Sequence, residues 1–188
     1  VLIIDTILIY DYIMNIFYLD EDFDRCVESM VDRHIVKMPT ESMQLLSTAH
    51  RMLDGNQYTA FNKLGRKMTK YYLNDGREDT IPKCISHKHP CQIWIQKSQD
   101  NYFYVLKLTM HMCEEYRYRY GKTHGVTLRL GSLLNPPKNI GSESFSLPPQ
   151  AMDKKYRHKD TITAYRQYYR DGKKHLAKWK GRTKPVWY

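Results

Sequence analysis

Apolar side chains recur every three or four positions over much of this 188-residue chain, which is the spacing of one face of an α-helix. The pattern predicts a helix from Asp20, where three successive acidic residues suit the positive end of the helix dipole. A second helix is expected from Pro39, a residue that favours the first helical turn, to Gly55. The longest pattern predicts a helix over 99–120 that stops at Gly121.

Other segments carry weaker patterns. Residues 15–19 are a short β-prone run, which predicts one strand near the N-terminus. Residues 55–88 are rich in glycine and polar side chains and predict a loop-rich connector, with one short helix around 60–71. A new helix is expected to follow Pro90.

Towards the C-terminus, the patterns predict a helix over 123–134 and a final helix over 161–180, separated by a proline-containing linker or active-site loop at 135–150. We therefore predict a mainly α, compact single-domain protein with at most a minor N-terminal strand. Met14 resembles a conventional start, so 1–13 are interpreted as an N-terminal extension and 14–188 as the domain.

Charge is concentrated near the C-terminus. From Asp153 onward the chain has twelve Lys or Arg and three Asp, so this stretch carries +9 of the formal +10. Tyrosines and tryptophans lie between the cations, and cations with aromatic faces suit a polyanion that also has bases to stack. We predict a basic helix and tail, from about residue 153, that bind nucleic acid; a solvated basic face with structural aromatics is the alternative. The candidate contacts in this segment are Lys173, Lys174, Lys178, Trp179 and Lys180.

Four irregularly spaced cysteines predict reduced thiols and a cytoplasmic protein, and the first residues lack the features of a signal peptide. No run reaches the roughly 18 apolar residues of a spanning helix, so no membrane is expected. The chain also lacks P-loop, GxGxxG, HExxH and GxSxG motifs, which argues against nucleotide, dinucleotide, metalloprotease and esterase chemistry. No metal or other cofactor is expected.

Residues 32–44 combine groups that can perform acid–base or nucleophilic chemistry. A carboxylate there can activate water or stabilise a cationic sugar-like transition state. An amine can instead attack a sugar carbon and form a Schiff base. A capping acid and a solvated lysine are the structural alternative. The candidates are Asp32, His34, Lys37 and Glu41, with Gln44 on the same helical face as Glu41.

Two further clusters are candidates. Cysteines and histidines within 84–91 lie too close together for a tetrahedral zinc site, so His89-Pro90 is interpreted as a rigid turn that directs an imidazole into a cleft, with Trp94 packed behind it. Basic and aromatic residues at the end of the long helix suit a phosphate clamp beside base-stacking tyrosines, or an ion-paired helix end. These clusters add His89 as a catalytic candidate and Trp94, Asn101, Arg119, Tyr120, Lys122 and His124 as nucleic-acid contacts.

Several motifs together resemble a family of small, mostly phage-encoded proteins. They are Met-Asn-Ile-Phe-Tyr-Leu-Asp from Met14, His-Ile-Val-Lys-Met-Pro-Thr-Glu-Ser from His34, Leu-Ser-Thr-Ala-His-Arg from Leu46, His-Pro-Cys-Gln-Ile-Trp from His89, Arg-Tyr-Gly-Lys-Thr-His from Arg119, and the segment from Trp179 to Tyr188. That family has a weaker likeness to pyrimidine-dimer DNA glycosylases. It is also similar to glycosylases that remove hypermodified pyrimidines from phage DNA in bacterial defence.

The resemblance implies a DNA glycosylase that flips a modified pyrimidine, for example a glucosylated hydroxymethyl base, out of viral duplex DNA and leaves an abasic site. The dimer glycosylases use an N-terminal amine, which residues 1–13 would block, so water or an internal lysine is expected instead. Asp32 or Glu41 would activate water, His34 and His89 would orient the base, and Lys37 would stabilise charge or act as nucleophile. The alternatives are a non-catalytic nucleic-acid-binding protein and, more weakly, a base-modifying transferase; a monomer is expected.

Overall fold

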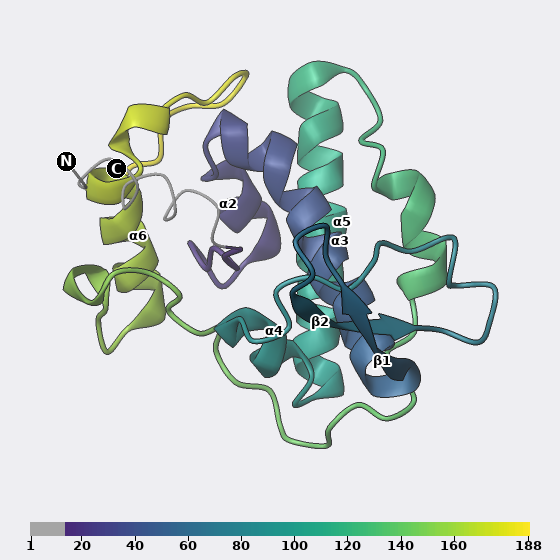
Figure 1. Cartoon of the computed structure of the whole chain (residues 1–188). Coiled ribbons are helices and arrows are strands. Elements are labelled where there is room, and N and C mark those ends of the chain that lie inside the picture. The colour runs from purple at the N-terminus through teal and green to yellow at the C-terminus, as the bar shows by residue number, and fades with distance from the viewer. Residues whose placement is uncertain (1–13) are drawn as a thin grey trace.

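The computed structural model describes residues 14–188, and its architecture is mainly helical with one small sheet, as predicted (Figure 1). The N-terminal extension predicted for 1–13 lies outside the described residues. The elements, in chain order, are α2 (Phe23–Glu28), α3 (Asp32–Asp54), β1 (Asn56–Phe61), β2 (Lys67–Tyr72), α4 (Pro90–Ile95), α5 (Gln99–Tyr120), the 3₁₀ turns η2 (Thr127–Leu133) and η3 (Lys154–Tyr156), α6 (Thr161–Gly172) and η4 (Lys174–Leu176).

Helices α3 and α5 form the centre of the molecule and lie side by side in Figure 1. They are antiparallel, because Asp32 at the start of α3 contacts Arg119 at the end of α5, while His50 near the end of α3 contacts Tyr102 near the start of α5. Side chains between them, such as Leu46 and Val105, are fully buried in one hydrophobic core. The shorter helices α2, α4 and α6 and the extended segment after Met14 pack their apolar residues into the same core.

The bounds of α5 follow the predicted pattern because both ends carry local signals. Ser98 caps the first turn by accepting a hydrogen bond from the Asp100 amide. Gly121 ends the helix in the left-handed region at φ 65°, which a residue with a side chain adopts only with strain. The predicted start of α4 at Pro90 and the end of α3 at Gly55 are also confirmed.

The predicted start of the second helix at Pro39 is wrong, because α3 already begins at Asp32 and Pro39 lies inside it. A proline in a helix interior removes one backbone hydrogen bond and costs about 3 kcal/mol or more. The apolar face of α3 continues on both sides of the proline through the buried side chains of Ile35, Met38 and Met43. Burial of this continuous face is what stabilises the helix across Pro39.

Three other predicted elements differ from the structure. Residues 15–19 are extended but pair with no strand in the described part of the chain; they are buried instead, with Leu19 fully so. The predicted α-helix over 123–134 is the 3₁₀ turn η2. The final helix stops at Gly172 rather than Lys180, and Lys173 forms its C-cap through a backbone bond to the Tyr168 carbonyl.

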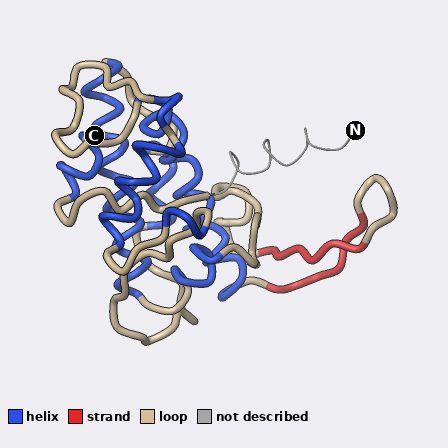
Figure 2. The backbone as a smooth tube through the Cα atoms, turned by 90° about the vertical axis from the view of Figure 1, so that its left-hand side faces the viewer, coloured by secondary structure: helices blue, strands red, loops and turns tan. Residues whose placement is uncertain are grey.

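The predicted connector contains a β-hairpin where a short helix was expected. Strands β1 and β2 are antiparallel, with Asn56 opposite Tyr72 and Phe61 opposite Lys67. The Asn62 side chain accepts hydrogen bonds of 2.9 Å from the amides of two turn residues, and Gly65 takes φ 70°. Figure 2 shows that this hairpin projects away from the helical body. Alternation of apolar and polar residues is absent because neither face of the hairpin packs on the core.

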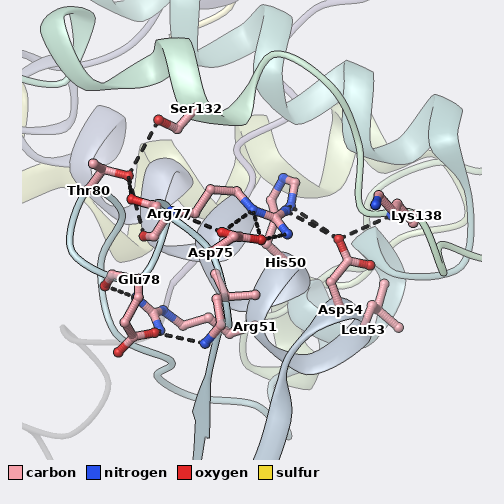
Figure 3. Close-up of polar contacts among 12 residues, drawn as sticks. His50, Arg51, Leu53, Asp54, Asp75, Arg77, Glu78, Thr80, Ser132 and Lys138 are labelled. Carbon is pink, nitrogen blue, oxygen red and sulfur yellow. Dashed lines mark hydrogen bonds and ion pairs between the residues drawn. The ribbon is translucent and has the colours of Figure 1, made fainter.

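A buried arginine fixes the chain that follows the hairpin to the end of α3 (Figure 3). The Arg51 side chain has no exposed surface and forms an ion pair with Glu78. Its Nε donates to the Pro82 carbonyl at 2.6 Å, and one Nη donates to the carbonyls of Glu78 and Ile81 at 2.8 and 3.0 Å. Glu78 also accepts from the Leu73 amide at 2.9 Å, directly after β2. Its pKa falls to about 2 because Lys83, the Leu73 amide and Arg51 all donate to it.

A second buried chain of hydrogen bonds runs through His50 in the same region (Figure 3). His50 Nε2 lies 2.9 Å from the Tyr102 hydroxyl, which donates to the Leu133 carbonyl at 2.7 Å. Nε2 is therefore the protonated nitrogen of a neutral ring, and Nδ1 accepts from Arg77 Nη1 at 2.7 Å. Burial, and then the positive charge of Arg77, lower the pKa of His50 to about 4.

The His50 ring predicts a specific pH dependence of stability. Its folded pKa of about 4 lies below the ordinary value of 6.5, so below pH 6.5 the unfolded chain takes up a proton that the folded chain does not. The contribution of His50 to the free energy of unfolding is fully present above pH 6.5. It is lost as pH falls towards 4, and the loss amounts to at most about 3 kcal/mol. We expect the unfolding free energy of His50→Gln, measured with urea, to fall less between pH 6.5 and 4.5 than that of the wild type. The matched control is His175→Gln at an exposed position; equal slopes for all three proteins would contradict the assignment.

Candidate active site and nucleic-acid interface

One stripe of α3 carries three of the four chemical candidates from residues 32–44. His34, Lys37 and Glu41 follow one another at three and four positions, so they lie on the same side of the helix. Lys37 Nζ and Glu41 Oε1 form an ion pair of 2.9 Å. The Glu41 side chain is only 12% exposed and the Lys37 side chain 39%, so the carboxylate lies below the surface and the amine at its edge. This amine–carboxylate pair is the strongest chemical feature of the predicted set.

His34 lies deeper along the same stripe. It is 5% exposed, its Nδ1 is 2.5 Å from the Tyr169 hydroxyl of α6, and its ring stacks on Phe17 at a centroid distance of 4.3 Å. These contacts attach α3 to α6 and to the extended segment after Met14. His34 therefore fixes the orientation of the stripe that carries Lys37 and Glu41.

Asp32 is predicted as catalytic, but its carboxylate is committed to the fold. Asp32 Oδ1 accepts from Arg119 Nη1 at 3.0 Å and from the Lys180 amide at 2.8 Å, while the Asp32 amide donates to the Lys178 carbonyl at 2.8 Å. The bonds with Lys178 and Lys180 attach the C-terminal tail to the start of α3, and the bond from Arg119 attaches α5 to it. The residue joins elements and presents no free carboxylate oxygen pair to a substrate.

Arg119, predicted as a phosphate clamp, is buried with no exposed side-chain surface. Beyond Asp32, its Nε donates to Glu115 at 2.7 Å, and its two Nη atoms donate to the carbonyls of Met30, Val27 and Glu28 at 2.8 to 3.3 Å. These carbonyls close the end of α2, where backbone acceptors lack helical partners. The guanidinium is saturated by the protein itself, so for Arg119 the phosphate-contact prediction is wrong and the alternative, an ion-paired helix end, holds.

Trp94 and Asn101 are also structural rather than exposed contacts. Trp94 is 6% exposed, and its indole N–H donates to the Ser146 hydroxyl at 2.9 Å. Asn101 is fully buried; its side chain donates to the Trp94 carbonyl and accepts from the Ser146 amide. Together they hold the proline-containing segment 135–150 against α4 and α5. Neither side chain has surface to offer to nucleic acid.

His89 caps α4 and borders a surface pocket. Its Nδ1 accepts from the Cys91 amide at 3.2 Å, while Nε2 is buried and has no hydrogen-bond partner among the described residues. Burial lowers the pKa of the ring. The pocket, of about 520 Å³, is lined by His89 and Met152, by the cations Lys154 and Arg157, and by the acid Asp153. The expected turn is present, and the imidazole lies against this cavity.

The remaining predicted contacts separate into exposed and packed side chains. Lys122, Lys174, Lys178 and Lys180 are exposed, whereas Lys173 is 7% exposed and lies over the Tyr168 ring. Gln44 is half-buried on α3, and Trp179 donates from its indole to the Ser29 carbonyl at 2.9 Å.

Part of the basic set lies near the start of α3, where Lys178 and Lys180 are bonded through their backbones to Asp32. Lys180 Nζ lies 5.0 Å from the centre of the Tyr120 ring, and His124 Nε2 lies 3.1 Å from the carbonyl of Val36, the residue before Lys37. Figure 1 shows the C-terminal segment, in yellow, at the same end of the molecule as the start of α3 and the end of α5. The fold therefore brings the amine–carboxylate pair and the basic tail to one end of the central helix pair.

The predicted set misses a second basic feature. Lys63, Arg66, Lys67 and Lys70 are all exposed on the hairpin, which carries no acidic residue from Asn56 to Tyr72. Their close spacing in the sequence is the signal that identifies them. The prediction treats 55–88 as a connector and therefore overlooks this basic cluster.

Within residues 14–188, His, Cys, Asp and Glu side chains form no group of three placed to hold a metal ion. None of the helices in this range combines the length and apolar character needed to cross a bilayer. Comparison with known proteins gives no match: no family model fits the chain, and no curated protein or solved structure is similar to it.

The structural role of Asp32 predicts the behaviour of Asp32→Asn. Loss of the charge weakens the bonds from Arg119 and the Lys180 amide and leaves a buried guanidinium less well compensated. We expect urea unfolding to show a loss of about 1–2 kcal/mol. Asp24→Asn, which removes an exposed partner of His111, is the control and should change stability by less than about 0.5 kcal/mol. A fully stable Asp32→Asn protein would instead return Asp32 to the catalytic candidates.

Proposed function

We propose that the protein is a DNA glycosylase that flips a modified pyrimidine out of duplex DNA and hydrolyses its N-glycosidic bond. The observation that supports this most is the Lys37–Glu41 pair on α3, with its shielded carboxylate and partly exposed amine, on the helix whose first residue is bonded to the lysine-rich C-terminal tail. A base must leave the duplex before such a pair can reach the glycosidic bond. The tail supplies cations for the phosphates, and Tyr120 supplies a ring close to them.

In the proposed reaction, Glu41 accepts a proton from a water molecule whose oxygen bonds to the sugar carbon. The bond from that carbon to the base nitrogen breaks, and its electron pair leaves with the base. The Lys37 ammonium stabilises the charge that develops there and supplies a proton. An ammonium paired with a carboxylate has no lone pair for attack on the sugar, so the pair favours hydrolysis over Schiff-base chemistry.

The substrate class comes from the resemblance of the motifs to phage-related glycosylases. We propose a hypermodified pyrimidine of viral DNA, such as a glucosylated hydroxymethyl base, as the excised group, with host defence as the setting. The protein would act as a cytoplasmic monomer without a cofactor. The pocket beside His89, whose rim carries Lys154, Arg157 and Asp153, is a candidate to hold the extruded base.

A second candidate function is nucleic-acid binding without catalysis. It is favoured by the commitment of the catalytic candidate Asp32 to internal contacts, while lysines of the C-terminal tail stay exposed and available to a polyanion. In this case the Lys37–Glu41 pair would serve only as an i, i+4 bridge on α3.

A direct assay of base release distinguishes the two candidate functions, because only a glycosylase releases a base from DNA. Purified protein is incubated in EDTA with phage DNA carrying unmodified, hydroxymethylated or glucosylated pyrimidines. Released bases are identified by mass spectrometry, and abasic sites are counted with an aldehyde probe. We expect release from one modified DNA, reduced by roughly 10²–10⁴-fold in Glu41→Gln and at least about 10²-fold in Lys37→Met. Both variants should still bind DNA.

The matched control is Glu143→Gln, which breaks the exposed Lys97–Glu143 pair elsewhere on the surface and should leave release unchanged. Borohydride trapping provides an independent check, since a covalent protein–DNA adduct that disappears in Lys37→Met would show Lys37 to be a nucleophile. Salt-sensitive binding to every DNA with no release from any would establish the non-catalytic alternative.

A further inference from the structure

The β1–β2 hairpin has no structural task that accounts for its composition. From Asn56 to Tyr72 it carries four cations and no acid, so this one excursion holds a charge of +4. Nearly every strand residue is exposed on both faces. Exposed side chains at and near the tip include Phe61 at 64% and Leu64 at 76%. A two-stranded hairpin that buries no apolar face gains little stability from itself.

The root of the hairpin, in contrast, is held firmly. Gly55 packs so closely that a side chain there would lie within 2.7 Å of the Arg51 and Tyr72 carbonyl oxygens. Leu73, directly after β2, is 3% exposed, and its amide donates to Glu78, the partner of buried Arg51. The arm is thus anchored at its base and exposed along its length, as Figure 2 shows.

The register places cations and rings on both faces of the arm. Tyr58 lies opposite Lys70 on one face, and Phe61 lies opposite Lys67 on the other. Lys63 and Arg66 occupy the turn. Any surface that contacts either face, or the tip, therefore meets positive charge together with an aromatic or aliphatic side chain.

We propose that the β1–β2 hairpin is a DNA-binding arm that lies in the major groove of a duplex, with its four cations on the flanking phosphates. The major groove admits a two-stranded β-ribbon, and phosphates match the charge of the arm. Phe61 and Leu64 contact base edges in the groove, where thymine methyl groups offer apolar surface. Pairing of the arm with a second copy of the chain is opposed by repulsion between two +4 ribbons.

The inference rests on the proposed DNA substrate but not on the chemistry at Glu41. The arm follows the C-terminal end of α3, whereas the C-terminal tail is attached to its N-terminal end. Substitutions on the arm are therefore remote from the Lys37–Glu41 pair and from the tail. This separation allows binding and catalysis to be tested independently.

The test is the salt dependence of binding to an unmodified 30-base-pair duplex. The arm variant replaces Lys63, Arg66, Lys67 and Lys70 with Gln. The control replaces four exposed cations elsewhere, Lys88, Lys97, Lys107 and Arg129, and so has the same net charge. Four lost phosphate contacts should reduce the slope of log K against log salt by about 3.6 in the arm variant. We expect a change below about 1 in the control.

Equal slopes for the arm variant and the control would overturn the proposal, because the effect would then be one of net charge. A slope that stays at the wild-type value while light scattering shows an altered oligomeric state would make the hairpin a protein–protein surface instead. Phe61→Ser with Leu64→Ser should weaken binding and leave the salt slope unchanged. Circular dichroism checks that each variant is folded.

The base-release assay separates the two proposals. Loss of duplex binding in the arm variant, with no base release by the wild type, would support the arm and reject the glycosylase. Base release that is unaffected in the arm variant, with unchanged binding, would support the glycosylase and reject the arm.

Discussion

The guanidinium of Arg119 is the contact on which one end of this structure depends. It lies without exposed surface between α2, α3 and α5, and it donates to two carboxylates and to three carbonyls at the end of α2. A buried cation is tolerated only when its donors are satisfied, so every element around it must be in place at once. Glu115 extends the contact to Arg182 of the tail at 2.8 Å. The tail is therefore part of the folded body rather than a loose appendage.

A second buried arginine organises the opposite end of the same helix pair. Arg51 holds the segment after the hairpin through Glu78 and three backbone carbonyls, and the neighbouring His50 chain joins α3 to α5 through Tyr102. Each network has its own consequence for function. The Arg119 network attaches the lysine-rich tail to the start of α3, the helix that carries the Lys37–Glu41 pair, while the Arg51 network holds the root of the projecting hairpin.

The contacts of each polar residue in the fold explain why residues of the same type on the same helix have different roles. Asp32 and Glu41 are both acids on α3, but Asp32 meets Arg119 and the tail, whereas Glu41 meets only a partly exposed lysine in the contacts described. Burial of a charged group with many donors stabilises the fold. A shielded carboxylate beside one accessible amine is an arrangement that can act on a substrate. We propose function at the pair on α3 whose amine is partly exposed.

The sequence by itself determined the elements whose signals are local. Ser98 and Gly121 set the ends of α5, Pro90 set the start of α4, and helical spacing gave the mainly α class. The sequence also located the basic C-terminal segment, because the number of charged residues in a segment can be counted without knowing the fold. The tertiary structure alone decided the role of Arg119, because its partners Met30 and Asp32 lie 89 and 87 positions away. The hairpin, too, was shown by the tertiary structure alone. Its strands are exposed on both faces, so they lack the alternation of apolar and polar residues that burial of one face imposes.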